Sequence, residues 1–139
     1  MNKNIVILGS GRSGTSFLSN LLNSNGVNAG RCTPGTMESL EVREINEAYL
    51  SKHFQAKTRS KFPYGILPED EIQVEEEFQK RAKGYIENMN KNGGQWWNDS
   101  VYWWMMKDPR STLLHDMWVK HFDILIGVFR NPTEVTNSY

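Results

Sequence analysis

Residues 4–16, with the sequence NIVILGSGRSGTS, decide the fold of this chain. They begin with a short apolar run rich in β-branched side chains, which is typical of a buried strand in a parallel sheet. A glycine-rich loop comes next, and apolar residues then recur at helical spacing as far as Asn25 and Gly26. A strand, a glycine loop and a helix in this order predict an anion site, because loop N–H groups and the positive helix end converge there.

The loop differs from the nucleotide-hydrolase pattern at one position. Gly9 and Gly14 have the spacing of a P-loop, but Thr15 stands where the pattern has the lysine that reaches the outer phosphates. Arg12 lies inside the loop, and its planar guanidinium group suits a phosphate or a sulfate. We therefore interpret the loop as an anion site, with a glycine-rich turn that binds no ligand as the alternative.

Apolar patterns in the rest of the chain predict alternating helices and strands. Helices are expected over residues 37–53, from Pro68 to residue 92, from Leu113 onward, and from a cap at Thr133 to the end. Two buried strands are predicted over residues 101–106 and 123–129, and residues 58–68 are predicted to be a loop. The alternation predicts one α/β domain over residues 1–139, with three layers, α/β/α, around a mainly parallel sheet.

The composition argues against several classes of function. Lys plus Arg and Asp plus Glu number 16 each, and this balance disfavours a general nucleic-acid binder. Cys32 is the single cysteine, so no intrachain disulfide forms, and no cluster of His and Cys suggests a metal site. The sequence has no stretch apolar enough for a signal peptide or a membrane span. We expect a soluble, cytoplasmic protein that uses no metal.

The tryptophans and histidines allow more than one interpretation. All five tryptophans lie between residues 96 and 118, where they form either core or a wall that stacks on an acceptor. His53, His115 and His121 are interpreted as surface or packing residues rather than catalytic groups.

A second candidate site follows the last predicted strand. Arg130 stands at the carboxyl end of that strand, the edge at which open α/β sheets bind ligands. Ser138 lies about one and a half turns into the helix expected from Thr133, and its hydroxyl can face the same ligand from there. An arginine and a hydroxyl at this place suit a second phosphate, although Arg-Asn-Pro is also a plausible strand exit.

The glycine loop at residues 9–16 and the segment at residues 130–138 together resemble the PAPS-dependent sulfotransferase family. PAPS is 3′-phosphoadenosine 5′-phosphosulfate. In that family an Arg-Ser-Gly-Thr-[Ser/Thr] loop binds the 5′-phosphosulfate, and an Arg-x-Pro segment with a serine eight residues after the arginine binds the 3′-phosphate. Residues 107–110 (KDPR) and 41–47 (EVREINE) are similar to segments of bacterial members, whereas residues 54–95 are unmatched. The resemblance implies a P-loop-like sulfotransferase core that binds PAPS through Gly11, Arg12, Ser13, Gly14, Thr15, Ser16, Arg130 and Ser138.

The resemblance also implies a reaction. A sulfuryl group passes from PAPS to a hydroxyl or amine of a small-molecule, lipid or carbohydrate acceptor, with Lys107 stabilising charge and Glu41 as the base. Glu38, Glu44 and Asp108 are the other candidate bases. The histidine base of the cytosolic animal-type enzymes has no counterpart, because Asp108 follows Lys107 directly.

Other interpretations of the same residues stay open. The chain can be a nucleotide-binding module without catalysis, or a P-loop kinase, which Thr15 disfavours. Lys107 and Arg110 can be structural, paired with Asp108 or Asp116. Members of the family continue beyond the point at which this chain stops, over the nucleotide. From that difference we expect weak nucleotide binding, little turnover by the chain alone, and self-association into a homo-oligomer through an exposed flank.

Overall fold

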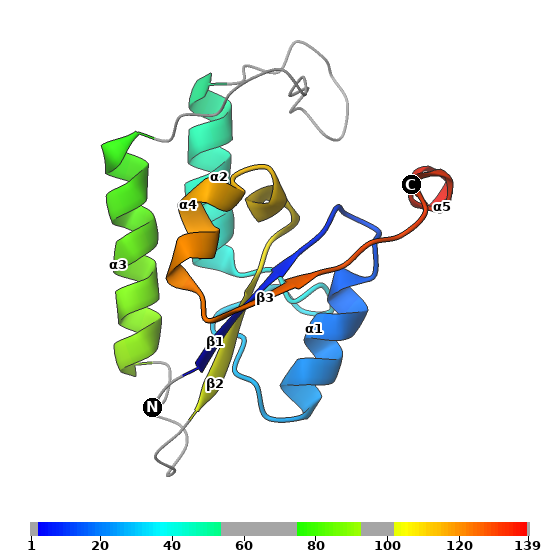
Figure 1. Ribbon diagram of the computed structural model, residues 1–139, viewed down its shortest axis with the longest axis horizontal. Helices are drawn as coiled ribbons and strands as arrows, with labels where there is room; N and C mark the ends of the chain where they lie inside the picture. The colour runs from blue at the N-terminus through cyan, green and yellow to red at the C-terminus, as the bar shows by residue number, and fades with distance from the viewer. Residues whose placement is uncertain (1–2, 54–74, 93–101, 139) are drawn as a thin grey trace.

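The computed structural model describes residues 3–53, 75–92 and 102–138, which form a small sheet with helices around it (Figure 1). The strands are β1 (Lys3–Leu8), β2 (Trp103–Lys107) and β3 (Ile124–Gly127). The α-helices are α1 (Thr15–Ser24), α2 (Leu40–His53), α3 (Glu76–Asn92), α4 (His115–Trp118) and α5 (Pro132–Asn137). Two short 3-10 helices, η1 (Pro109–Thr112) and η2 (Val119–His121), flank α4.

β1 is the central strand of the sheet, whose order is β2-β1-β3. Both neighbours run parallel to β1, with Ile5 opposite Met105 on one side and opposite Ile124 on the other. The outer edge of β2 is paired at one point, through a parallel bridge between Asn28 and Trp104. The α/β class and the parallel sheet predicted from the sequence are therefore confirmed.

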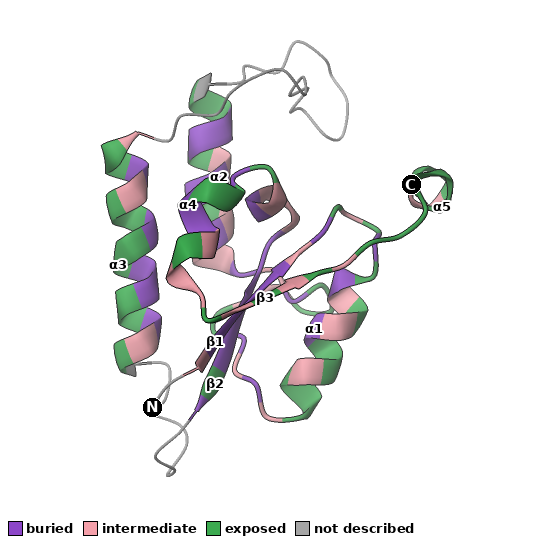
Figure 2. Ribbon diagram, in the orientation of Figure 1, coloured by how far each residue is buried: buried purple, intermediate pink, exposed green. Residues whose placement is uncertain are grey.

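The side chains of β1 alternate between two cores, because successive residues of a strand point to opposite faces of the sheet. Val6 packs into the larger core, which residues of α2, α3 and α4 complete. Ile5 and Ile7 pack with Met105 into a smaller core, against Leu18 of α1. Helices thus lie on both faces of the sheet, and the buried residues face inward from each of them (Figure 2).

The tryptophans that the structure describes divide between core and surface. Trp104 and Trp118 are fully buried, and each meets the ring of Tyr85 edge to face, at centroid distances of 6.0 and 6.1 Å. Trp103 is 40% exposed. Trp96 and Trp97 lie outside the described residues. The core interpretation is therefore confirmed for Trp104 and Trp118.

The prediction that the third strand is buried is wrong. β3 is an edge strand among the described residues, and its side chains alternate between half-buried and exposed. Ile124 and Ile126 pack toward α1, whereas Leu125 is 51% exposed on the other face. Phe129, just after the strand, is 87% exposed. The continuous apolar run of β3 is therefore buried on one face of the sheet only.

Several predicted helix boundaries also change. The helix expected from Leu113 onward is present only as the short α4 and η2, with no long amphipathic helix. The last helix is capped by Asn131, whose side chain accepts a hydrogen bond from the Thr133 backbone N–H at 2.9 Å, so the predicted cap at Thr133 is wrong. The predicted loop at residues 58–68 and the helix start at Pro68 lie outside the described residues.

Within residues 3–53, 75–92 and 102–138, no helix is both long enough and apolar enough to cross a lipid bilayer. Over the same ranges, no three His, Cys, Asp or Glu side chains come together as potential metal ligands.

Candidate functional site

The loop between β1 and α1 is folded tightly by its glycines. Arg12 and Gly14 both have left-handed backbone conformations, with φ of 65° and 102°. Gly9 is packed so closely that an added Cβ would lie 2.8 Å from Ser13 Oγ and 2.9 Å from the Val128 carbonyl oxygen. Real Cβ atoms do not approach backbone so closely, and only glycine fits at this position. The side chain of Ser13 donates to the Ser10 carbonyl at 2.6 Å, which holds the loop closed on itself.

The loop leads into α1, and the N-terminus of this helix has no side-chain cap. Gly14 is the N-cap of α1 and has no side chain, so none of its atoms accepts a bond from the first-turn N–H groups. The first N–H groups of a helix have no intrahelical acceptor and carry partial positive charge. Gly11 and Ser16 are half-buried and Arg12 is exposed, so the helix start is open to a ligand. This end of α1 suits an anion.

A buried lysine from the neighbouring strand faces the same helix start. Lys107 ends β2, and its Nζ donates to Ser16 Oγ at 3.2 Å and to the Thr36 carbonyl oxygen at 2.8 Å. Its side chain is 2% exposed. The P-loop position itself supplies no cation, because Thr15 is uncharged. Its side chain is buried against Gly9. Lys107 therefore brings positive charge to the first turn of α1 from another strand.

The environment of Lys107 makes its proton easier to lose. Burial, the largest effect, lowers the pKa of Lys107 from its ordinary value of 10.5, while the charges of Glu38 and Asp108 act in the opposite direction. Glu38 Oε1 lies 3.8 Å from Lys107 Nζ. A cation, a carboxylate and an uncapped helix start thus meet at the carboxyl edge of the sheet.

Glu38 lies between two cations. Its second oxygen is 3.9 Å from Arg110 Nη1, and its side chain is 19% exposed. Arg110 also pairs with Asp108 at 2.8 Å and with Glu47 at 3.0 Å. The structural pairing with Asp108 is therefore present for Arg110, whereas Asp116 pairs with His115 instead. Because Glu38 keeps some exposure, it can meet a molecule from solvent.

Asp108 and Asn46 form a buried network beneath the site. Asn46 Nδ2 donates to Asp108 Oδ2 at 2.7 Å and to Ser111 Oγ at 2.9 Å, and Trp118 Nε1 donates to Asn46 Oδ1 at 2.8 Å. Asp108 and Asn46 are both fully buried. The network joins α2, η1 and α4, and it holds the turn after Lys107 in place. Asp108 is enclosed and has the surroundings of a structural carboxylate.

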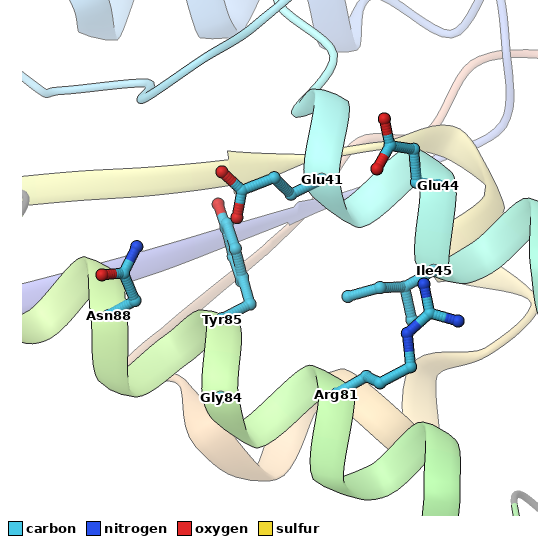
Figure 3. Close-up of a pocket in the computed structure, with 7 residues that line it drawn as sticks. All are labelled: Glu41, Glu44, Ile45, Arg81, Gly84, Tyr85 and Asn88. Carbon is cyan, nitrogen blue, oxygen red and sulfur yellow. The ribbon is translucent and has the colours of Figure 1, made fainter.

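Glu41 and Glu44 lie in a different place from Lys107. Both line a groove between α2 and α3, with Tyr85 on the facing helix (Figure 3). Among the described residues, the carboxylate that contacts Lys107 is that of Glu38. The family resemblance favoured Glu41, but the chain geometry brings Glu38 to the lysine.

The second predicted site is only partly assembled. Arg130 Nη1 donates to the Arg12 carbonyl oxygen at 3.2 Å, which places Arg130 beside the loop, and Arg130 Nε pairs with Glu134 at 3.3 Å. The Ser138 hydroxyl instead donates to the Val135 carbonyl at 2.8 Å, within its own helix. α5 lies away from the other helices (Figure 1). Arg130 therefore contacts the loop at Arg12, whereas the Ser138 hydroxyl is hydrogen-bonded to Val135.

Two contributors were not found from the sequence. Thr112 Oγ1 accepts from the Gly9 N–H at 2.9 Å and donates to the Gly9 carbonyl at 3.1 Å, which fastens the start of the loop to η1. The carbonyl oxygen of Thr36 lies 2.8 Å from Lys107 Nζ, nearer than Ser16 Oγ at 3.2 Å. Neither has a sequence signal, because each acts through a contact between distant segments.

Comparison of the chain with protein-family models, with curated proteins and with solved structures gave no match.

Proposed function

We propose that this chain is a nucleotide-binding domain with a P-loop-like sulfotransferase core, which binds PAPS and transfers its sulfuryl group to an acceptor hydroxyl or amine. The observation that supports it best is the contact of Lys107 with Ser16, because it brings a buried cation to an uncapped helix start beside Glu38. In this arrangement Lys107 lies between a candidate anion site, at the start of α1, and a candidate base, Glu38. The single cysteine suits a cytoplasmic setting.

The loop and Arg130 are assigned to the two ends of the donor. Loop N–H groups, Arg12 and the start of α1 would bind the 5′-phosphosulfate. Arg130, held against the Arg12 carbonyl, would bind the 3′-phosphate, for which its planar guanidinium is well shaped. Ser138 joins it only if its hydroxyl leaves the Val135 carbonyl.

Lys107 and Glu38 are assigned to the transfer. PAPS supplies an activated sulfuryl group. Glu38 accepts the proton of the acceptor hydroxyl as the new oxygen–sulfur bond forms and the bond from sulfur to the 5′-phosphate breaks. Lys107 donates a hydrogen bond toward the oxygen that leaves with negative charge, so that charge is stabilised as it develops. The product nucleotide is adenosine 3′,5′-bisphosphate (PAP).

Titration with PAP and with ATP tests the donor assignment. We expect PAP to shift the backbone amide signals of residues 9–16 in heteronuclear NMR spectra and to bind at least tenfold more tightly than ATP, because only PAP carries the 3′-phosphate. Tighter binding of ATP would favour a P-loop kinase. PAP binding without any sulfuryl transfer from PAPS would favour a binding module without catalysis. A PAP response confined to other residues would reject the loop as the site.

Glu38→Gln is expected to lower the rate of sulfuryl transfer by about 10²- to 10⁴-fold, the usual contribution of a general base. Its affinity for PAP should stay the same or rise, because a negative charge beside the anion is removed. Glu41→Gln is the matched control and should leave transfer within a few fold of the parent chain. Single-turnover assays with labelled PAPS measure both. Equal losses in the two variants would mean that Glu38 is not the base.

Arg130→Ala is expected to weaken PAP binding by roughly 10- to 100-fold, since one charge-assisted hydrogen bond to phosphate is lost. Adenosine 5′-phosphosulfate lacks the 3′-phosphate, and its affinity should change little. Calorimetric titration of both ligands into both proteins measures the difference. The assignment fails if the two ligands weaken by the same factor.

A further inference from the structure

The segment between α1 and α2 contains a tight turn at residues 33–38. Its base is fastened by an antiparallel bridge between Cys32 and Ser39. Beyond the bridge, the Thr33 N–H donates to the Glu38 carbonyl at 2.9 Å, and the Glu38 N–H donates to Thr33 Oγ1 at 3.0 Å. The turn is therefore closed by its own hydrogen bonds, and its tip can move without breaking the base.

The tip of this turn covers the amine of Lys107. The Thr36 carbonyl oxygen lies 2.8 Å from Lys107 Nζ, and the lysine side chain is 2% exposed. The amine also contacts Ser16 Oγ at 3.2 Å and Glu38 Oε1 at 3.8 Å. A phosphate or a sulfate cannot reach an amine that is so enclosed. For Lys107 to bind such an anion, the Thr36 carbonyl has to leave it.

The tip is exposed, and the backbone beside it is strained. Gly35 and Thr36 are both exposed, and an added Cβ at Gly35 would meet no atom within 4 Å. Met37 has a φ of 57°, a left-handed conformation that is unfavourable for a residue with a side chain. Asn20 of α1 holds the tip down, because its Nδ2 donates to the Gly35 carbonyl at 2.9 Å. Strain of this kind is typical of segments that switch between two conformations.

We propose that residues 33–38 are a lid on Lys107, which is closed when no anion is bound and opens to let an anion reach the amine. The identity of the anion, PAPS or PAP, rests on the proposed function, whereas the opening itself does not. In the closed state the Thr36 carbonyl takes a hydrogen bond that the anion needs. In the open state an anion oxygen accepts that bond, and the exposed carbonyl bonds to water. One hydrogen bond to the lysine replaces another, so the anion shifts the population toward the open state.

Acylation of the whole chain by N-hydroxysuccinimidyl acetate measures the opening without any nucleotide. Peptide mass spectrometry gives the labelling rate of Lys107 relative to Lys83, whose side chain is 67% exposed. Asn20→Ala removes the bond from α1 to the tip and should raise the relative rate about fivefold. Gly35→Ala disfavours the closed turn directly, because Gly35 has a φ of 78°, and should raise the rate by roughly five- to thirtyfold.

Asn25→Ala is the matched control for Asn20→Ala. The Asn25 side chain donates to the Leu21 carbonyl at 2.8 Å, just as that of Asn20 donates to the Ser16 carbonyl at 2.7 Å, but at the other end of α1. This control should leave the labelling rate of Lys107 unchanged. Urea unfolding followed by circular dichroism confirms that each variant is folded.

Anion binding is measured on the same proteins. An affinity for a state that is rarely populated rises in proportion to the population of that state. Asn20→Ala and Gly35→Ala should therefore bind PAP more tightly, each by about the factor by which its labelling rises. Sodium sulfate should protect Lys107 from acylation in a saturable way, and sodium chloride at equal ionic strength should not.

The outcomes separate the lid from the nucleotide site. Labelling of Lys107 that is as fast as that of Lys83 in the parent chain, or unchanged in both lid variants, overturns the inference even if PAP binds normally. Faster labelling without tighter PAP binding also overturns it, because opening would then not be coupled to the anion. If PAP binds none of the proteins, the proposed function is rejected. Saturable protection by sulfate would then still support the lid, and absence of protection would overturn it as well.

Discussion

Lys107→Met is expected to weaken PAP binding by roughly 10- to 100-fold, because a buried charge-assisted hydrogen bond near the anion is lost. Methionine keeps much of the volume of the lysine stem and should preserve the packing around β2. The measurement is isothermal titration of PAP into the two proteins. Lys83→Met, a change at an exposed lysine of α3, is the control and should bind PAP like the parent chain.

The same lysine predicts how binding depends on pH. The protonated form attracts the anion, and burial lowers the pKa of Lys107 from 10.5. PAP affinity should therefore fall as pH rises, at a lower pH than for an exposed lysine, and it should be retained toward neutral pH. Lys107→Met should abolish this alkaline loss. An alkaline loss that persists in the variant, or wild-type affinity in it, would remove Lys107 from the site.

Asn46→Ala is expected to lower the free energy of unfolding by about 3 kcal/mol, because a buried donor and a buried acceptor are removed together. The substitution leaves the Trp118 indole N–H without its acceptor. It also removes the hydrogen bond that Asn46 donates to the buried carboxylate of Asp108. It also leaves a cavity. Buried polar atoms without partners are unfavourable, so these effects act in the same direction.

Urea unfolding followed by circular dichroism measures the loss for Asn46→Ala. Asn137→Ala, at the exposed end of α5, is the control and should change stability by less than about 0.5 kcal/mol. A loss below 1 kcal/mol for Asn46→Ala would mean that the network of Asp108, Ser111 and Trp118 re-forms around the gap. PAP affinity should fall as well, since the turn after Lys107 is held by this network.

Local patterns predicted the parts of the fold that depend on neighbouring residues. The apolar run at residues 4–8, the glycine loop and the helix after it form one continuous signal, and all three elements are present at that place. The parallel sheet followed from strands that alternate with helices. Arg12 and Arg130 were both singled out, and the structure brings the guanidinium of one to the carbonyl of the other.

The parts that depend on distant contacts were not predictable in this way. Whether β3 is central or at the edge depends on the order of strands, which its own apolar run does not encode. Glu38 meets Lys107 because the segment before α2 passes along β2, where Ser39 bonds to the Lys107 carbonyl. No spacing rule distinguishes Glu38 from Glu41. The helix expected from Leu113 is shortened to α4 and η2, and the turn before it is bonded at Ser111 to Asn46 of α2, a contact that local spacing does not encode.

The position of β1 at the centre of the sheet also has a consequence for how the chain folds. Lys3 of β1 is paired with Trp103 of β2, and Ile5 with Ile124 of β3, so about a hundred residues separate the partners. Among the described residues, no two strands form a hairpin. Closing such long loops is slow, because chain entropy is lost before the contacts form. During synthesis β1 emerges before both of its partners, and its apolar residues stay unpaired until β2 and β3 follow. Helices α2 and α3, which contact one another, can form earlier, and the sheet assembles once β2 and β3 have been made.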